Sequence, residues 1–288
     1  VNDVAETFLM RLARKSGLDG LAAMESRFKK GGVLWSRPFW QESRADLRDY
    51  LRRHGVTWCE DPSNEDERFD RVRARKVLAA LAPLGIDSQT IKESALHLNM
   101  AKYTLAHYVQ QAVAAHVSED RGDLVIRQIV DANLLPHETQ RQILNRATQW
   151  FSGAAFPPRD SAMIEADIGL SQSGKHVLAG CVFTAGKRVI RITREHNAVK
   201  DTRCPTTEIW DGRWRLDGPH EDGMEIRALG EAIKDCPDWR ETGLPRQSLL
   251  SSPAIWRGET LIAAPLAGYN ADWDARIVTD FASFMLSH

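Results

Sequence analysis

The chain has 288 residues, of which 43% are hydrophobic and 27% are charged, as in globular proteins of two domains or three small ones. No hydrophobic run approaches the ~20 residues that a membrane-spanning helix needs, so we expect no membrane attachment and a cytoplasmic location. Lys and Arg total 38 against 39 Asp and Glu, so any RNA contact must come from local basic patches. The four cysteines form no Cys-x-x-Cys pair, and we expect no metal held by protein side chains.

Residues 1–82 alternate between helical patterns and short apolar runs. Val4, Phe8 and Leu12 form a stripe with helical spacing, which Gly17 ends. We expect a short buried strand within residues 32–39, and then a helix that a Ser43–Asp46 capping box opens and Gly55 ends. Residues 56–59 predict a second short strand. This alternation is typical of an α/β layer.

After residue 82 the pattern becomes mainly helical, and from about residue 157 it becomes mixed, with short strand patterns. Long helical patterns at 88–116 and 136–151 follow the Pro83-Leu84-Gly85 break, and residues 177–191 predict two short strands. Trp210-Asp211-Gly212-Arg213-Trp214 is a hairpin signal of the Asp-Gly type. We therefore expect an α/β domain at 1–82, a mainly helical domain with a short hairpin at 83–196, and a small mixed α/β domain at 197–288.

Two acidic residues, Asp3 and Glu6, open the first helical pattern three residues apart, so their carboxylates leave the same face of the helix. Such a pair can hold an ammonium ion. The alternative is a structural role, with Asp3 capping the helix and Glu6 at the third helical position, where the helix dipole favours acids. The spacing alone favours the capping interpretation.

A basic row follows an acidic turn at residues 60–67. Arg68, Arg71 and Arg75 fall at i, i+3 and i+7, so we expect three guanidinium groups along one side of a helix. Each planar guanidinium can bind a phosphate through two hydrogen bonds. The alternative is a solvated face paired with the neighbouring acids of the turn.

Both motifs resemble those of bacterial tRNA(Ile)-lysidine synthetases. Asp3, Glu6 and Thr7 ahead of residues 14–21 match that family's His-x-x-Asp-Asp-x-x-Glu-Thr signature and its Arg-Gly-Ser-Gly-x-x-Gly-Leu turn, with Asn2 in place of one Asp. Residues 61–66 match its Asp-x-Ser-Asn-x-Asp stretch. The resemblance implies that Asp3 and Glu6 bind the lysine substrate.

The resemblance also assigns roles to three arginines. Arg71 and Arg75 match the arginines that follow the Asp-x-Ser-Asn-x-Asp stretch, which implies a catalytic role, although Val72 replaces an Asn that many members have. Arg37 with Pro38 matches the family's Arg-Pro-Leu element and is a candidate nucleotide or tRNA contact. Residues 237–264 resemble the terminal domain of the family less specifically.

The family ligates lysine to the wobble cytidine of the CAU anticodon of isoleucine tRNA, which changes codon and amino-acid identity. It first activates the base with ATP and later releases AMP. The resemblance thus implies a PP-loop ATPase-type (adenine nucleotide α-hydrolase-like) domain followed by two tRNA-docking domains. It also implies L-lysine and isoleucine tRNA as partners, ATP with Mg²⁺, and possible homodimers.

The nucleotide loop of this family, Ser-Gly-Gly-x-Asp-Ser, does not occur in the 288 residues. We therefore expect a truncated chain that keeps the C-terminal part of the catalytic domain and is inactive alone. Two hypotheses follow, a ligase seen in part or a non-catalytic tRNA-binding remnant. A related PP-loop thiolase is disfavoured, because those enzymes commonly use paired cysteines.

Overall fold

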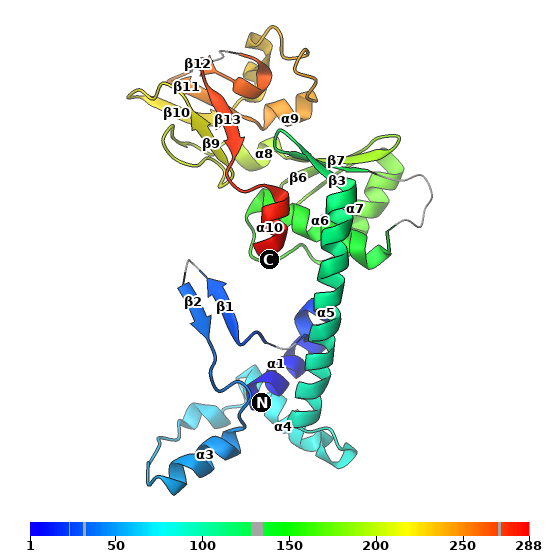
Figure 1. Cartoon of the computed structure of the whole chain (residues 1–288), viewed down its shortest axis with the longest axis vertical. Helices are drawn as coiled ribbons and strands as arrows, with labels where there is room; N and C mark the ends of the chain where they lie inside the picture. The colour runs from blue at the N-terminus through cyan, green and yellow to red at the C-terminus, as the bar shows by residue number, and fades with distance from the viewer. Residues whose placement is uncertain (23, 31–32, 128–134, 270–271, 288) are drawn as a thin grey trace. The chain divides into compact units, whose positions relative to one another are not determined.

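The computed structural model describes residues 1–22, 24–30, 33–127, 135–269 and 272–287, and it is a mixed α/β protein (Figure 1). The chain forms two compact units, Val1–His107 and Tyr108–His288, so the boundary falls inside helix α5 (Ser88–His116). The division into three domains remains a prediction. None of the helices in the described ranges is long and apolar enough to cross a membrane.

Unit 1 is built mainly from helices, of which α1 (Asn2–Ala13) is the first. Val4 of α1 and Ala95 of α5 form its small core with Phe8, Met24 and Trp40. Helix α1 also packs on α4 (Asp70–Leu81) and on the short α2 (Leu18–Leu21). The 3₁₀ turns η1 (Pro62–Glu65) and η2 (Ala82–Leu84) flank α4. The predicted first helix is confirmed, and Val4 and Phe8 of its stripe contribute to the core, whereas Leu12 is exposed.

Helix α3 (Arg44–Arg53) confirms the predicted capping box. The Ser43 hydroxyl accepts a hydrogen bond from the Asp46 backbone N–H at 3.0 Å, and Gly55 follows the helix with φ 64°. A positive φ is easy for glycine and strained for most other residues. The chain can therefore turn directly after α3 and lead into the acidic turn at η1.

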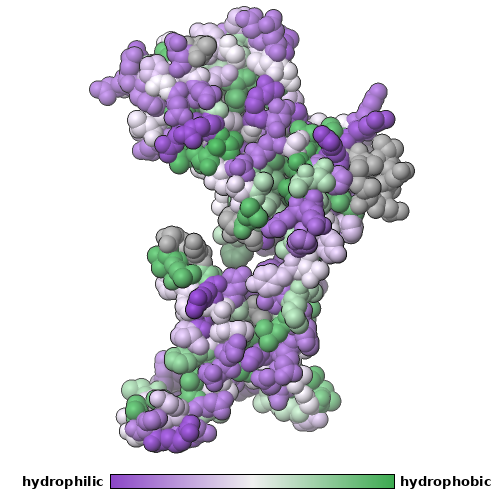
Figure 2. Space-filling model, in the orientation of Figure 1, coloured by the Kyte–Doolittle hydropathy of each residue, from purple (hydrophilic) through white to green (hydrophobic). Residues whose placement is uncertain are grey.

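One antiparallel hairpin, β1 (Arg27–Lys30) with β2 (Val33–Ser36), provides the strands described in unit 1. The strand expected within 32–39 exists, but the prediction that it is buried is wrong, because all four residues of β2 are exposed. Figure 2 shows hydrophobic residues gathered at the hairpin. The strand predicted at 56–59 is also wrong, since this segment is irregular and exposed; its β-branched and aromatic residues meet no pairing edge.

Unit 2 contains a five-stranded antiparallel sheet in the order β3-β4-β7-β6-β5. Its strands are β3 (Val117–Asp120), β4 (Asp123–Arg127), β5 (Lys175–Leu178), β6 (Cys181–Ala185) and β7 (Val189–Arg194). Helix α6 (His137–Ser152) packs on β6 and β7, and α7 (Asp160–Ser173) packs on β5. The predicted helices at 88–116 and 136–151 are confirmed, whereas the expected short hairpin is only part of a larger sheet.

The remainder of unit 2 contains a four-stranded sheet in the order β12-β11-β10-β8 and a pair β13-β9. Its strands are β8 (Cys204–Pro205), β9 (Trp214–Asp217), β10 (Met224–Ala228), β11 (Pro253–Arg257), β12 (Thr260–Ala263) and β13 (Asp274–Ile277). Helix α8 (His196–Val199) precedes these strands, η3 (Gly230–Asp235), α9 (Arg246–Leu250) and η4 (Pro265–Ala267) lie between them, and α10 (Phe281–Ser287) follows. The predicted Asp-Gly turn is confirmed, with positive φ at Asp211 and Gly212 between the bridged Trp210 and Trp214.

Arg213, from this turn, links the two parts of unit 2. Its guanidinium lies 4.1 Å from the Trp150 ring centre and 4.3 Å from that of Phe151, and it donates to the Gly122 carbonyl at 2.8 Å. Burial lowers the pKa of Arg213 to about 10. Gly122 must remain glycine, because its φ is 92° and a Cβ there would lie 2.2 Å from the Trp214 ring.

Asp123 is the second link. Its carboxylate accepts hydrogen bonds from Arg191 at 2.7 Å and from the Ser248 hydroxyl at 2.6 Å. Burial raises the pKa of Asp123 to about 6. The unfolded chain has a lower value near 3.9, so the folded protein holds this proton more tightly. The stabilisation is therefore full below about pH 4 and is lost as the pH rises through about 6.

We expect Asp123→Asn to remove this pH dependence. The free energy of unfolding of the wild type, relative to the variant, should fall by up to roughly 3 kcal/mol between pH 4 and pH 7. Urea titrations at several pH values measure it. Asp217→Asn is the control, because Arg276 holds the pKa of exposed Asp217 below its usual range and the difference should have the opposite sign. A flat difference for Asp123→Asn would contradict the analysis.

Candidate functional site

Asp3 and Glu6 lie on the same side of α1, but their environments differ. The Asp3 side chain is 61% exposed, whereas Glu6 is 1% exposed. The helix begins at Asn2, and no side chain caps it. The capping interpretation of Asp3 is therefore wrong, and the two carboxylates are available for other interactions.

Glu6 forms a buried ion pair with Arg75 of α4. The Arg75 Nε lies 2.6 Å from Glu6 Oε1, and Arg75 Nη1 donates to the Asn64 carbonyl at 3.1 Å. Arg75 thus connects α1 with the acidic turn around η1. The second carboxylate oxygen of Glu6 is buried and has no hydrogen-bond partner among the described residues, so Glu6 retains an unused acceptor.

Arg44, at the start of α3, brings a second guanidinium to the two acids. Its Nη2 lies 3.8 Å from Asp3 Oδ1 and 3.7 Å from Glu6 Oε1. Its backbone N–H donates to the side-chain oxygen of Asn2 at 2.9 Å, and the Asn2 amide lies 3.4 Å from the Ser88 hydroxyl. Asn2 therefore ties α1 to α3 through its side-chain oxygen and to Ser88 of α5 through its amide.

The expected row of three arginines is only partly formed. Arg71 and Arg75 are on α4, but Arg68 precedes the helix and pairs with Asp66, so its place in the row is wrong. This pairing raises the pKa of Arg68 and lowers that of Asp66. The expectation failed because Asp70 begins α4. The alternative of internal pairing is thus correct for Arg68, while Arg71 is exposed.

The acidic turn is shaped by its own hydrogen bonds. The Asp61 carboxylate accepts from the Ser63 N–H at 2.9 Å, and this bond lowers the pKa of Asp61. Val72, which occupies the position of a family Asn, is buried in α4. Its side chain contributes packing in place of a hydrogen bond.

Arg37 lies just after β2. It donates to the Glu25 carbonyl at 2.9 Å, and its guanidinium lies 4.5 Å from the Phe28 ring centre. These contacts fix the end of the hairpin beside Pro38. They also leave the guanidinium next to a cavity.

This cavity has a volume of about 440 Å³, within the usual range for small-molecule sites. Asp3, Arg37, Arg44 and Arg71 line it, and its apolar wall contains Met24, Phe39, Trp40 and Leu47. Glu6 and Arg75 lie behind the lining, connected to it through Arg44. Nearby acidic and basic groups around an apolar wall suit a zwitterionic amino acid with a long side chain.

Sequence analysis did not identify Arg44 as a site residue. It lies 38 residues from Glu6 along the chain, and helical spacing gives no signal for such a contact. The sequence does show that Arg44 directly follows the capping Ser43. The backbone of a residue in the first turn is held in place by the cap, but this does not indicate which side chains it contacts.

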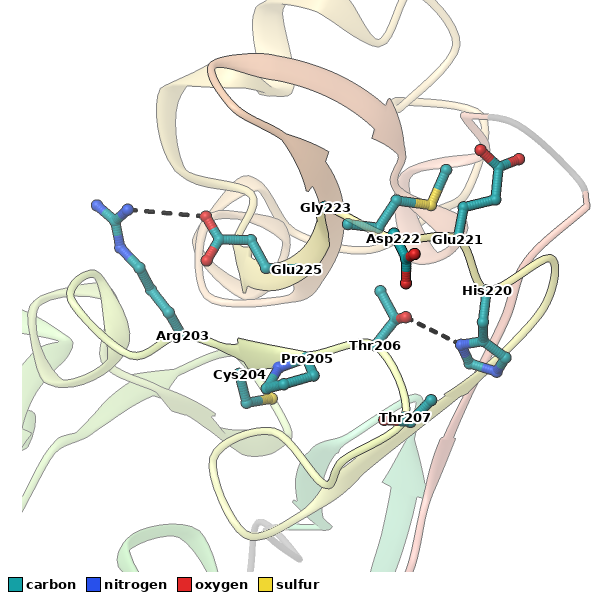
Figure 3. Close-up of a pocket in the computed structure, with 11 residues that line it drawn as sticks. Arg203, Cys204, Pro205, Thr206, Thr207, His220, Glu221, Asp222, Gly223 and Glu225 are labelled. Carbon is teal, nitrogen blue, oxygen red and sulfur yellow. Dashed lines mark hydrogen bonds and ion pairs between the residues drawn. The ribbon is translucent and has the colours of Figure 1, made fainter.

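A second cavity, of about 600 Å³, lies beside β8 and β10 in unit 2 (Figure 3). Its lining carries Glu221, Asp222 and Glu225 against Arg203, which lies 3.7 Å from Glu225. An excess of carboxylates repels phosphate groups. The unit 1 cavity is therefore the better candidate for a site that handles a nucleotide or RNA.

The described residues contain no group of three or more His, Cys, Asp or Glu side chains placed to hold a metal ion.

Comparison with known proteins identifies the family of the chain. Residues 1–81 match the family model of the PP-loop domain, a class of ATP-using domains. A tRNA(Ile)-lysidine synthase of Ruegeria pomeroyi is 43% identical over the whole chain, which covers 69% of that protein. The chain belongs to the tRNA(Ile)-lysidine synthase family, a family of ligases.

Two further relatives with the same name are more distant. The protein of Wolbachia pipientis wMel is 28% identical over 93% of the chain, and that of Xanthomonas campestris is 30% identical over 91%. The chain spans 64% and 66% of their respective lengths. It therefore corresponds to about two thirds of each of these relatives.

We expect Arg75→Ala to destabilise the protein by roughly 3 kcal/mol, because it leaves the buried Glu6 charge without its closest partner. Urea unfolding measures the loss. Arg71→Ala, an exposed position on the same helix, should cost less than about 0.5 kcal/mol. Adding Glu6→Gln to Arg75→Ala should recover much of the loss. Equal losses for the two arginine variants would show that the Glu6–Arg75 pair does not stabilise unit 1.

Proposed function

We propose that the protein containing this chain is a tRNA(Ile)-lysidine synthetase. It joins the ε-amino group of lysine to the wobble cytidine in the CAU anticodon of isoleucine tRNA. ATP activates the base, and AMP is released. Family membership supports the reaction class, and the charges around the unit 1 cavity support the lysine substrate. Mg²⁺, a homodimer and a cytoplasmic location remain predictions.

The paired acids Asp3 and Glu6 are the observation that carries this proposal. Asp3 lines the cavity and is exposed, so it can contact an incoming ammonium directly. Glu6 adds a buried negative charge with an unpartnered oxygen behind it. An ammonium ion has three hydrogen-bond donors, which suits two carboxylates on one helix face. The apolar wall suits the four methylene groups of lysine.

The arginines have different proposed roles. Arg71 and Arg37 line the cavity, and we propose that they contact the phosphate groups of the activated tRNA or the lysine carboxylate. Arg75 was expected to be catalytic, but its contacts with Glu6 and Asn64 favour a positioning role. In this arrangement Arg75 holds Glu6 and the acidic turn in place while Arg71 faces the substrate.

We expect the gene product that contains this chain to incorporate lysine into isoleucine tRNA with a CAU anticodon, in the presence of ATP and Mg²⁺. Labelled lysine retained on the tRNA measures the product, and one AMP should form for each lysine incorporated. The same tRNA with its wobble cytidine replaced by uridine is the matched control and should accept none.

AMP formation from lysine without tRNA, or equal labelling of the control tRNA, would contradict the assignment. Specific tRNA binding without any lysine transfer would instead support the alternative of a non-catalytic tRNA-binding protein. Asp3→Asn should raise the KM for lysine at least tenfold with the fold intact, because it removes the exposed partner of the ammonium.

A further inference from the structure

The position of Arg44 raises a problem for the lysine site. Its Nη2 lies 3.8 Å from Asp3 Oδ1 and 3.7 Å from Glu6 Oε1. A cation of the protein therefore already occupies the space between the two carboxylates that the proposed function assigns to the lysine ammonium. Lysine cannot approach both acids while this guanidinium remains there.

The contacts of Arg44 with the acids are loose. Both distances exceed the usual range for a hydrogen bond between charged groups, about 2.7–2.9 Å. By contrast, Arg75 lies 2.6 Å from the same Glu6 oxygen and also holds the Asn64 carbonyl. The Arg44 side chain is 42% exposed, and partly exposed ion pairs contribute little free energy. The Arg44 guanidinium can leave at small cost, whereas Arg75 is fixed.

The backbone of Arg44 is anchored even though its side chain is loose. The Arg44 N–H donates to Asn2, and the neighbouring Ser43 caps α3. The start of α3 therefore stays beside α1 when the side chain moves. Arg44 can swing out of the acid pair and return without any change in the helices.

The charges around the acid pair also favour displacement of Arg44 by an incoming ammonium ion. Asp3 and Glu6 carry two negative charges that Arg44 and Arg75 balance, while Arg37 and Arg71 against Glu42 leave the cavity lining with a further positive charge. Adding an ammonium with Arg44 in place would leave an excess positive charge beside a buried pair, which is unfavourable. Exchange of Arg44 for the ammonium leaves the charge of the site unchanged.

We propose that the Arg44 guanidinium occupies the ammonium subsite in the free protein and that lysine must displace it in order to bind. Arg44 would then be a residue that determines specificity, and we call this its placeholder role. This inference rests on the proposed function. Arg44 neutralises the acids while the site is empty and lowers their affinity for simple amines. A ligand must gain contacts along the cavity wall as well as at the acids in order to displace it.

Lysine binding to the chain, measured by isothermal titration calorimetry, tests the proposal. Arg44→Ala should bind lysine about five- to tenfold more tightly than the wild type, because the competing cation is removed. Arg44→Lys, which keeps a competing cation, should remain within about twofold of the wild type. n-Butylamine, which has the ammonium but no amino-acid group, should gain affinity for Arg44→Ala at least as much as lysine does.

Arg48→Ala is the matched control. It removes the same charge one turn along α3, but Arg48 pairs with Glu60 at 2.6 Å, away from the acid pair. It should leave lysine affinity unchanged, which excludes a general effect of net charge. Circular dichroism confirms that each variant is folded, and Arg44→Gln replaces Arg44→Ala if the latter unfolds.

The outcomes separate this inference from the proposed function. If Asp3→Asn weakens lysine binding but Arg44→Ala does not tighten it, the lysine site stands and the placeholder role is wrong. Weaker binding in Arg44→Ala would show that Arg44 contacts the lysine carboxylate instead. If Asp3→Asn has no effect, or if norleucine, which lacks the ε-amino group, binds as well as lysine, the proposed lysine site fails and this inference fails with it.

Discussion

The buried ion pair between Glu6 and Arg75 is the interaction on which the candidate site depends. A carboxylate that is 1% exposed needs a compensating charge. Arg75 supplies it from α4 and at the same time holds the acidic turn through the Asn64 carbonyl. One guanidinium therefore fixes the relative positions of α1, α4 and η1, and the cavity beside them takes its shape from this arrangement.

The two acids of the site, Asp3 and Glu6, have different environments and different partners. Glu6 is held inside the protein by a fixed arginine, and Asp3 faces the cavity beside the loosely placed Arg44. Asn2 secures the α3 backbone without adding a third negative charge. The site thus combines a buried, fixed ion pair with an exposed carboxylate and a loosely held guanidinium.

The sequence predicted features that depend on local chemistry. The first helix, the Ser43 capping box and the Asp211-Gly212 turn all arise from neighbouring residues, and each is confirmed. The sequence also predicted that Asp3 and Glu6 share one helix and that Arg71 and Arg75 share another, and the structure has both helices. Features that depend on distant residues were missed. The residues 56–59 have strand composition but no pairing edge, and strand β4 depends on pairing with the distant β7, with β3 paired to β4. Arg44 reaches Glu6 through tertiary packing, which spacing cannot reveal.

The central claim is that the carboxylates of Asp3 and Glu6 receive the lysine ammonium. Carbon-13 NMR of the side-chain carboxyl groups tests it most directly, with Asp3→Asn and Glu6→Gln used to assign the two signals. Titration with lysine should shift both signals saturably, and norleucine, which differs by the missing ε-amino group, should shift neither. Equal shifts with the two ligands, or no shift with lysine, would contradict the account.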